Sequence, residues 1–377
     1  MIGIIQEQHP DRCRLFMQWQ RMDWPILIDS LNLTGVAVVP LTYAIDEHGI
    51  VRFVKPSLEN IEDFLSQSYP QPYARPEAPV RIPYIDPLKP ETHSGTAASW
   101  RTYGDALFLW AGSPRLNEVI EAYQHALKID PKDSVSQFRL GVSYRRRYDS
   151  ERRRPDDFQK AVEHWTRALE MNPNQYIWRR RLQQYGPRLI KPYAFYDWVA
   201  EARQEIRARG ETPISLPVEP AGAEIATPVK DFDVVSPKRE EPDPGGKIMR
   251  DTRRFIEIEA VVVPSTIKAG QVARVHIIMR PKAKIKAHWN NEVDPLQLWI
   301  NPPKGWSVDN RHGTAPHPPQ AVSTETREVQ FEIRSPEKAP LGKFSVPAYA
   351  LYYVCEDVDG ACLYRRQDIR VSGWIQE

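Results

Sequence analysis

Two proline-rich segments divide this chain into three parts with different hydrophobic periodicities. Proline has no backbone N–H and ends helices and strands, so residues 71–95 and 209–251 are expected to connect folded parts. The parts themselves are residues 1–70, 96–208 and 252–377, and a length of 377 residues fits two or three domains. We predict a multidomain protein that combines α/β, all-α and all-β parts.

The balance of charge and apolar residues excludes some partners. The chain has 51 basic and 49 acidic side chains, so no long-range field attracts nucleic acid. The longest apolar run, Gly35 to Leu41, is far shorter than the roughly 20 residues needed to span a bilayer. Polar residues such as Glu7 and His9 follow the first strand at once, which does not fit a signal peptide. As written, the chain is expected to be cytoplasmic.

The first seventy residues follow an α/β order. Apolar runs at 2–5 and 26–28 predict short strands, and His9-Pro10-Asp11 opens a helix between them. Residues 41–45 and 50–54 predict a hairpin around Asp46-Glu47-His48-Gly49, and a helix over 58–68 follows.

This order, together with the strings Trp24-Pro25-Ile26-Leu27-Ile28-Asp29 and Val39-Pro40-Leu41-Thr42, resembles the carboxyl half of the redoxin (thioredoxin-like) family. The resemblance implies a cis Val39–Pro40 bond, with Val39 binding the backbone of a client. The cysteine motif of that family does not occur upstream. We therefore expect a partial thioredoxin-like fold, either from a truncated start or from a degenerate module. Cys13 is interpreted as a small apolar core residue rather than a resolving cysteine.

Two similar helical passages occupy the middle of the chain. One contains Tyr103-Gly104 and ends at Asp130-Pro131, and the other contains Leu140-Gly141 and ends at Asn172-Pro173. Small residues allow helices to approach closely, and the prolines end each second helix. The passages resemble tetratricopeptide repeats, with an insertion from Ser150 to Asp157. Residues 176–187 and 193–206 are expected to supply helices that cap their open end.

Arginine triplets within these repeats are candidates for peptide recognition. If Arg145, Arg146, Arg179 and Arg180 lie on a concave surface, their guanidinium groups could clamp a peptide carboxylate. The alternative, which we favour, is a solvated face balanced by neighbouring Asp and Glu.

The last 126 residues, 252–377, alternate in the manner of an antiparallel β-sandwich. Strands are expected at 255–263, 272–279, 296–300, 328–334, 344–355 and 362–371. Cys355 and Cys362 flank a polar turn that contains Gly360, so a disulfide between their strands is feasible. Before this domain, residues 209–251 predict an extended and partly disordered linker.

The strings Tyr352-Tyr353-Val354-Cys355 and Gly360-Ala361-Cys362-Leu363 resemble the immunoglobulin-like periplasmic domain of thiol:disulfide interchange reductases. That resemblance implies electron exchange with partner proteins through the two cysteines. A structural staple, or two reduced thiols, are the alternatives. His288, His312 and His317 are interpreted as surface loop residues, and we predict neither a metal nor a cofactor.

Two functional hypotheses follow. The first is a redoxin-related protein in which the repeats bind a protein or peptide and any chemistry is thiol–disulfide exchange at Cys355 and Cys362. The second is a non-enzymatic adaptor built on the repeats, with a degenerate thioredoxin-like module. Enzymatic activity is left open. The likeness of the sandwich also favours a periplasmic location if the true start is missing.

Overall fold

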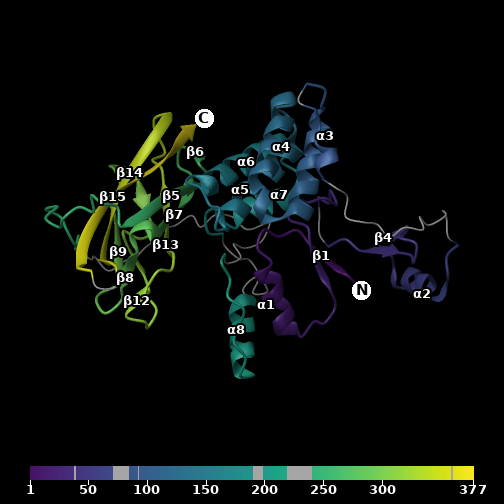
Figure 1. Ribbon diagram of the computed structural model, residues 1–377, viewed down its shortest axis with the longest axis horizontal. Helices are drawn as coiled ribbons and strands as arrows, with labels where there is room; N and C mark the ends of the chain where they lie inside the picture. The colour runs from purple at the N-terminus through teal and green to yellow at the C-terminus, as the bar shows by residue number, and fades with distance from the viewer. Residues whose placement is uncertain (38–39, 71–84, 92, 190–197, 219–239, 358–359) are drawn as a thin grey trace.

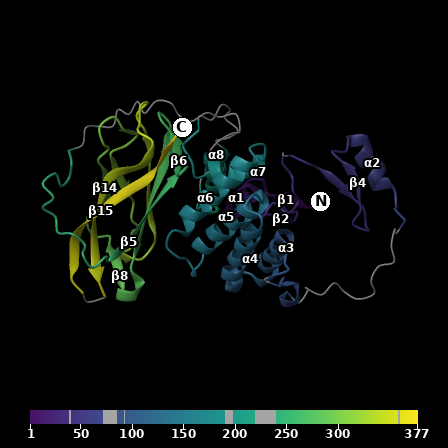
Figure 2. The same cartoon turned by 90° about the horizontal axis from the view of Figure 1, so that it is seen from above.

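The structure is a computed structural model that describes residues 1–37, 40–70, 85–91, 93–189, 198–218, 240–357 and 360–377. Three regions follow one another along the longest axis (Figure 1): a β-sandwich, a group of helices, and a small unit formed by β3, β4 and α2. The same order is visible from above in Figure 2. Helices, sheets and a sandwich in one chain bear out the prediction of a multidomain α/β protein at this coarse level.

The amino-terminal part contains the elements that its periodicity predicts. They are β1 (Gly3–Ile5), α1 (Asp11–Gln20), β2 (Ile26–Ile28), β3 (Tyr43–Ile45), β4 (Val51–Val54) and α2 (Leu58–Ser66). Strand β1 pairs with β2 in parallel, and β3 pairs with β4 as an antiparallel hairpin. Over the described part of the chain, these are two separate two-stranded sheets, and no ladder joins β2 to β3.

The middle of the chain forms antiparallel helix pairs. Its helices are α3 (Ala97–Ala106), α4 (Leu116–Ile129), α5 (Ser134–Tyr148), α6 (Asp157–Met171) and α7 (Tyr176–Gln183). The two glycines expected at close approaches do lie there. A Cβ at Gly141 would be 2.6 Å from Cδ1 of Trp165, and a Cβ at Gly104 would be 2.8 Å from Cε1 of Tyr123. The expected insertion is the loop between α5 and α6.

Of the two segments expected to cap the helices, the first forms α7, which packs on α6. Helix α8 (Trp198–Ala208), in the second segment, packs on α1 instead (Figure 1). Leu15 of α1 is fully buried against Val199, Ala202 and Ile206 of α8. The indole rings of Trp19 and Trp198 stack with centroids 6.0 Å apart. The apolar face of α8 therefore covers the helix of the amino-terminal part, a partner that periodicity alone does not identify.

The carboxyl-terminal part is a two-layer sandwich. Its strands are β5 (Ile256–Val263), β6 (Thr266–Lys268), β7 (Val272–Pro281), β8 (Ala287–Asn290), β9 (Leu296–Ile300), β10 (Ser307–Val308), β11 (His312–Ala315), β12 (Val322–Ser323), β13 (Arg327–Arg334), β14 (Gly342–Glu356) and β15 (Cys362–Gln376). One sheet has the order β10-β13-β7-β5, and the other contains β11-β9-β14-β15-β6 with β8 and β12. Alternate residues of both sheets fill a shared core that includes Trp289, Phe331 and Tyr352.

The ends of the expected linker pack onto the folded parts. Ile214 donates its backbone N–H to the Gln18 side chain at 3.0 Å. At the other end, Asp243 pairs with Arg366 at 2.8 Å, and Ile248 packs on Tyr349 of β14. Residues 240–251 are thus a covering segment on the sandwich rather than a free tether, while 219–239 lie outside the described residues.

Tyr185, which follows α7, lies where three parts of the structure meet. They are the segment before α1, the helices α3 to α7 and the sandwich. Its hydroxyl shares a 2.9 Å hydrogen bond with Nε2 of His9, from the amino-terminal part. Its ring stacks on Trp165 of α6, and its carbonyl accepts a 2.7 Å hydrogen bond from Nε2 of His276 on β7. Burial, followed by the nearby positive charge of Arg145, lowers the pKa of His9 to about 2, so this imidazole is neutral. The junction joins the parts through buried polar contacts.

The neighbouring residues Arg146 and Arg147 allow a test of the helical core. Both side chains of the Arg147–Asp157 pair are buried, with Nη2 and Oδ1 2.6 Å apart, whereas Arg146 is exposed. Arg147→Met would leave a buried carboxylate without its partner and should lower the free energy of unfolding by about 3–5 kcal/mol. Arg146→Met should change it by less than about 0.5 kcal/mol. Urea unfolding followed by circular dichroism measures both, and equal effects would contradict the burial of this pair.

Candidate functional site

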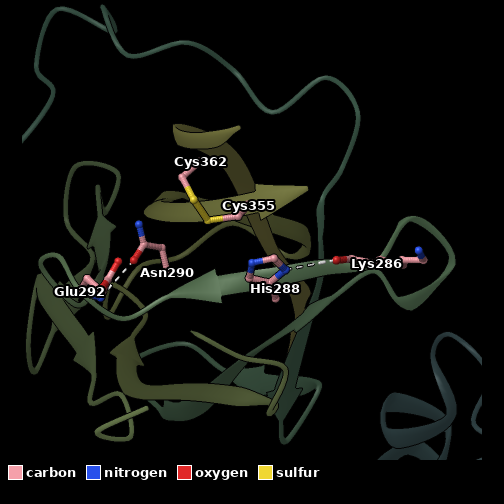
Figure 3. The surroundings of a disulfide bond; sticks show 6 residues. All are labelled: Lys286, His288, Asn290, Glu292, Cys355 and Cys362. Atoms are coloured by element: carbon pink, nitrogen blue, oxygen red, sulfur yellow. Dashed lines mark hydrogen bonds between the residues drawn. A yellow bond between two sulfur atoms is a disulfide. The ribbon is translucent and has the colours of Figure 1, made fainter. Parts of the chain in front are cut away.

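The two cysteines of the sandwich are joined at the end of the β14–β15 hairpin (Figure 3). Cys355 and Cys362 are directly opposite in register, their Cα atoms are 4.0 Å apart, and a disulfide links them. The preceding residue, Val354, points into the core, so alternation places Cys355 on the outer face of the sheet. The bond that the sequence made feasible is therefore present and lies on the outside of the sandwich.

The two sulfur positions differ in accessibility. Cys362 is exposed, whereas Cys355 is only 2% exposed. Thiol–disulfide exchange requires in-line access of a thiolate to one sulfur of the bond. The Cys362 side of the disulfide meets that requirement, and Cys355 is the sulfur shielded from an incoming reactant.

The turn between the cysteines depends on Gly360. A Cβ atom built at this position would lie only 1.3 Å from the backbone oxygen of Glu356. No other residue type fits there without movement of the turn. The glycine singled out in the sequence thus keeps the two strand ends close enough for the disulfide.

Charged side chains around the disulfide form local pairs. Arg253 holds Glu356 through two contacts, one of them 2.8 Å between Nη1 and Oε2. Lys286 lies 3.1 Å from the carboxylate of Asp357. Both pairs are exposed and contribute little stability, but each compensates a charge beside the sulfurs.

His288 is the neighbour of Cys355 on the strand at its other side. It lies on β8, and the register pairs it with Cys355, so Cys362, Cys355 and His288 form one row across three strands (Figure 3). Its Nδ1 is 3.3 Å from the backbone oxygen of Lys286. A carbonyl can only accept, so this contact places a hydrogen on Nδ1 and a lone pair on Nε2 when the ring is neutral.

The interpretation of His288 as a loop residue is therefore corrected. Ala287 and Trp289 on either side of it are buried, while His288 and Asn290 are only partly buried. This alternation is the sequence signal of a half-buried strand, and it was overlooked because the run is only four residues long. His312 likewise lies on a strand, β11.

The predicted peptide-binding arginines do not share one surface. Arg145 is buried, with its guanidinium 4.2 Å from the centre of the Phe158 ring and 3.1 Å from Asp149. Arg146 is exposed, and Arg179 and Arg180 are half-buried on α7. Arg180 Nη1 donates to Gln183 at 3.2 Å. Burial thus removes Arg145 from any peptide clamp, because its guanidinium stabilises the helical core instead.

The remaining candidates lie in the amino-terminal part. Val39 lies outside the described residues, so the cis Val39–Pro40 bond and its client contact stay predictions. Cys13 is half-buried on α1, and burial raises the pKa of its thiol, which disfavours the reactive thiolate. Within the described ranges, no group of three or more His, Cys, Asp or Glu side chains is placed to hold a metal ion. No described helix is long and apolar enough to cross a membrane.

Comparisons with known proteins do not place the chain in a family. No protein-family model matches it, and no curated protein is similar to it. Among solved structures, the sporulation control protein Spo0M of Bacillus subtilis is 12% identical over 33% of this chain and 50% of its own, with a TM-score of 0.17. The chain thus spans half the length of that protein.

Two further solved structures have similarly low scores. AggA, the major subunit of aggregative adherence fimbriae type I from Escherichia coli, is 10% identical over 32% of this chain and 95% of its own, with a TM-score of 0.19. The alkylpurine DNA glycosylase AlkC of Pseudomonas fluorescens is 11% identical over 74% of this chain and 71% of its own, with a TM-score of 0.16. These values assign neither a fold nor a function.

The difference in burial predicts which thiol reacts first after reduction. In Cys355→Ser, the remaining Cys362 thiol should be alkylated rapidly by iodoacetamide, because it is exposed. In Cys362→Ser, the Cys355 thiol should react much more slowly, since its side chain is buried. Cys13→Ser in both variants removes the third thiol. Mass spectrometry over a time course measures both rates, and faster labelling of Cys355 would contradict the assignment.

Proposed function

We propose that this protein carries out thiol–disulfide exchange at Cys355 and Cys362 with a dithiol or disulfide of a partner protein. The observation that supports it is the asymmetry of the pair, with an exposed Cys362 bonded to a buried Cys355 on the outer face of the sandwich. A purely structural staple does not need one sulfur accessible to thiolates, whereas exchange does.

In this exchange, a dithiol of the partner supplies the two electrons that reduce the disulfide. One partner thiolate forms a bond to the sulfur of Cys362, the Cys355–Cys362 bond breaks, and its electron pair stays on the sulfur of Cys355. The second partner thiolate then attacks the partner's sulfur in this mixed disulfide and releases Cys362 as a thiolate. The partner is oxidised to a disulfide, the pair is reduced to two thiols, and the reverse sequence reduces a partner disulfide.

We also propose the finer fold assignments that the sequence indicates. Close helix contacts at Gly104 and Gly141 support a tetratricopeptide-like arrangement for α3 to α7. Antiparallel strands in two packed sheets support an immunoglobulin-like sandwich. The order of strands and helices in residues 1–70 supports kinship with the redoxins.

A second candidate, a binding scaffold without catalysis, is favoured by the surface of the β3–β4–α2 unit. Leu58 and Leu65 of α2 are 82% and 74% exposed, and Val54 of β4 is 57% exposed. Leu58 and Leu65 are seven positions apart and so lie on the same face of α2, and contiguous exposed apolar surface is characteristic of binding sites. Under this alternative the disulfide only staples the hairpin, and removing it leaves every exchange rate unchanged.

Insulin reduction in the presence of dithiothreitol distinguishes the two candidates. We expect the wild-type protein to accelerate the precipitation of insulin chains, and the Cys355→Ser/Cys362→Ser double variant to fall back to the uncatalysed rate. Cys13→Ser is the matched control, since it removes a thiol distant from the hairpin and should retain the full rate. Equal rates for the wild type and the double variant would refute exchange and favour the scaffold.

A further inference from the structure

We propose that His288 is the acid–base group of the cysteine pair, which donates a proton to the sulfur of Cys355 when the disulfide opens. This inference deepens the proposed function and rests on it. It starts from the register of three strands, in which Cys355 has Cys362 opposite on β15 and His288 opposite on β8. Directly opposed residues of antiparallel strands have Cβ atoms about 4.5–5.5 Å apart on the same face. The register thus makes His288 the neighbour of Cys355 on the side away from Cys362.

The shielded sulfur is the one that needs a proton donor. When a thiolate attacks the exposed Cys362, the electron pair of the broken bond stays on Cys355. That residue is 2% exposed, so water solvates a thiolate there poorly. A protonated imidazole beside it can transfer its proton to the leaving sulfur or hold the thiolate as an ion pair. In the reverse direction, the neutral ring takes the proton back from the Cys355 thiol.

The orientation of the ring fits this role. Nδ1 faces the backbone oxygen of Lys286 at 3.3 Å, which leaves Nε2 as the nitrogen that gains and loses the proton. The ring lies on the outer face of the sheet and is only partly buried, so the proton can be exchanged with solvent.

The charges around His288 come from several elements. Lys286 precedes it by two residues, and its ammonium pairs with Asp357 of the hairpin turn. Glu356 of β14 pairs with Arg253, which precedes β5. Glu292 follows β8 and is exposed. Tyr364 of β15 stacks on Tyr353 of β14, and burial raises the pKa of its hydroxyl, so it remains neutral. The four charged groups Lys286, Asp357, Glu356 and Arg253 thus form two pairs, and His288 is the group suited to follow the charge on sulfur.

The test measures reduction of the protein's own disulfide by glutathione between about pH 5 and 8, where imidazole changes charge. His288→Gln keeps a donor for the Lys286 carbonyl but cannot carry the proton. Each rate is divided by the fraction of glutathione present as thiolate, because that fraction itself rises with pH. We expect this corrected rate to fall by about tenfold or more in His288→Gln and its pH dependence within the window to flatten. His312→Gln on β11, the matched control, should behave as the wild type. An unchanged rate and pH profile in His288→Gln would overturn the inference.

Two further measurements separate this role from a structural one. Added imidazole should restore much of the rate of His288→Ala, which a merely packing side chain would not permit. Thiolate absorbance near 240 nm should show that the Cys355 thiolate of the reduced protein forms at higher pH in His288→Gln. The proposal would be contradicted if imidazole fails to restore the rate of His288→Ala and the thiolate forms at the same pH in His288→Gln as in the wild type. Slow reaction of the variants alone would then reflect a structural role.

The inference and the proposed function can fail separately. If the double cysteine variant reduces insulin as well as the wild type does, the proposed function fails, whatever glutathione does to the pair. If the wild type is active in that assay and His288→Gln is equally active at every pH, only the role of His288 fails.

Discussion

The junction at Tyr185 is the contact on which the relative placement of the three parts depends. A single residue offers its hydroxyl to His9, its ring to Trp165 and its carbonyl to His276. Glu328 lies 2.7 Å from the other ring nitrogen of His276, so each nitrogen of this imidazole faces an oxygen. Burial alone would raise the pKa of Glu328, but the hydrogen bond and charge of His276 hold it below its usual range.

This arrangement is specific because buried polar groups must be satisfied. A displacement of either neighbouring part would leave donors or acceptors without partners away from water, at a cost of roughly 1–3 kcal/mol for each group. The guanidinium of Arg145 also lies 4.8 Å from the centre of the Tyr185 ring and covers its face. Apolar contacts complete the junction, since Val261, Val263 and Ile278 of the sandwich join the core of the helices.

The junction also determines which face of the sandwich is free. The helices cover the outer face of the sheet that contains β5 and β7, and residues 240–251 cover part of the outer face of the other sheet. The disulfide lies on this second face, at the hairpin end, on the opposite side of the sandwich from the repeats. If the helices bind a partner and the cysteine pair exchanges disulfides, as proposed, the two events would take place on opposite sides of the sandwich.

Local patterns predicted much of the secondary structure but not the contacts between distant segments. The alternation of apolar and polar residues predicted six strands that the sandwich contains, and it placed Cys355 and Cys362 on two neighbouring strands. Such a pattern is visible within a few residues, because successive side chains of a strand point to opposite faces. The apolar face of α8 carries no information about its partner, so its packing on α1 was missed. The row from Cys362 through Cys355 to His288 was missed for the same reason. It depends on the register between β8 and β14, whose residues are more than sixty positions apart in the chain.

The arginine triplet of α5 shows how helix geometry limits such patterns. Successive residues of a helix are rotated by about 100°, so three adjacent side chains cannot share one face. Arg145 accordingly lies against Phe158, Arg147 pairs with Asp157, and only Arg146 between them is exposed to solvent. A run of like charges thus becomes two buried anchors and one surface residue. Three consecutive arginines suggest a basic binding surface, but the helix geometry places two of the three side chains in the helical core.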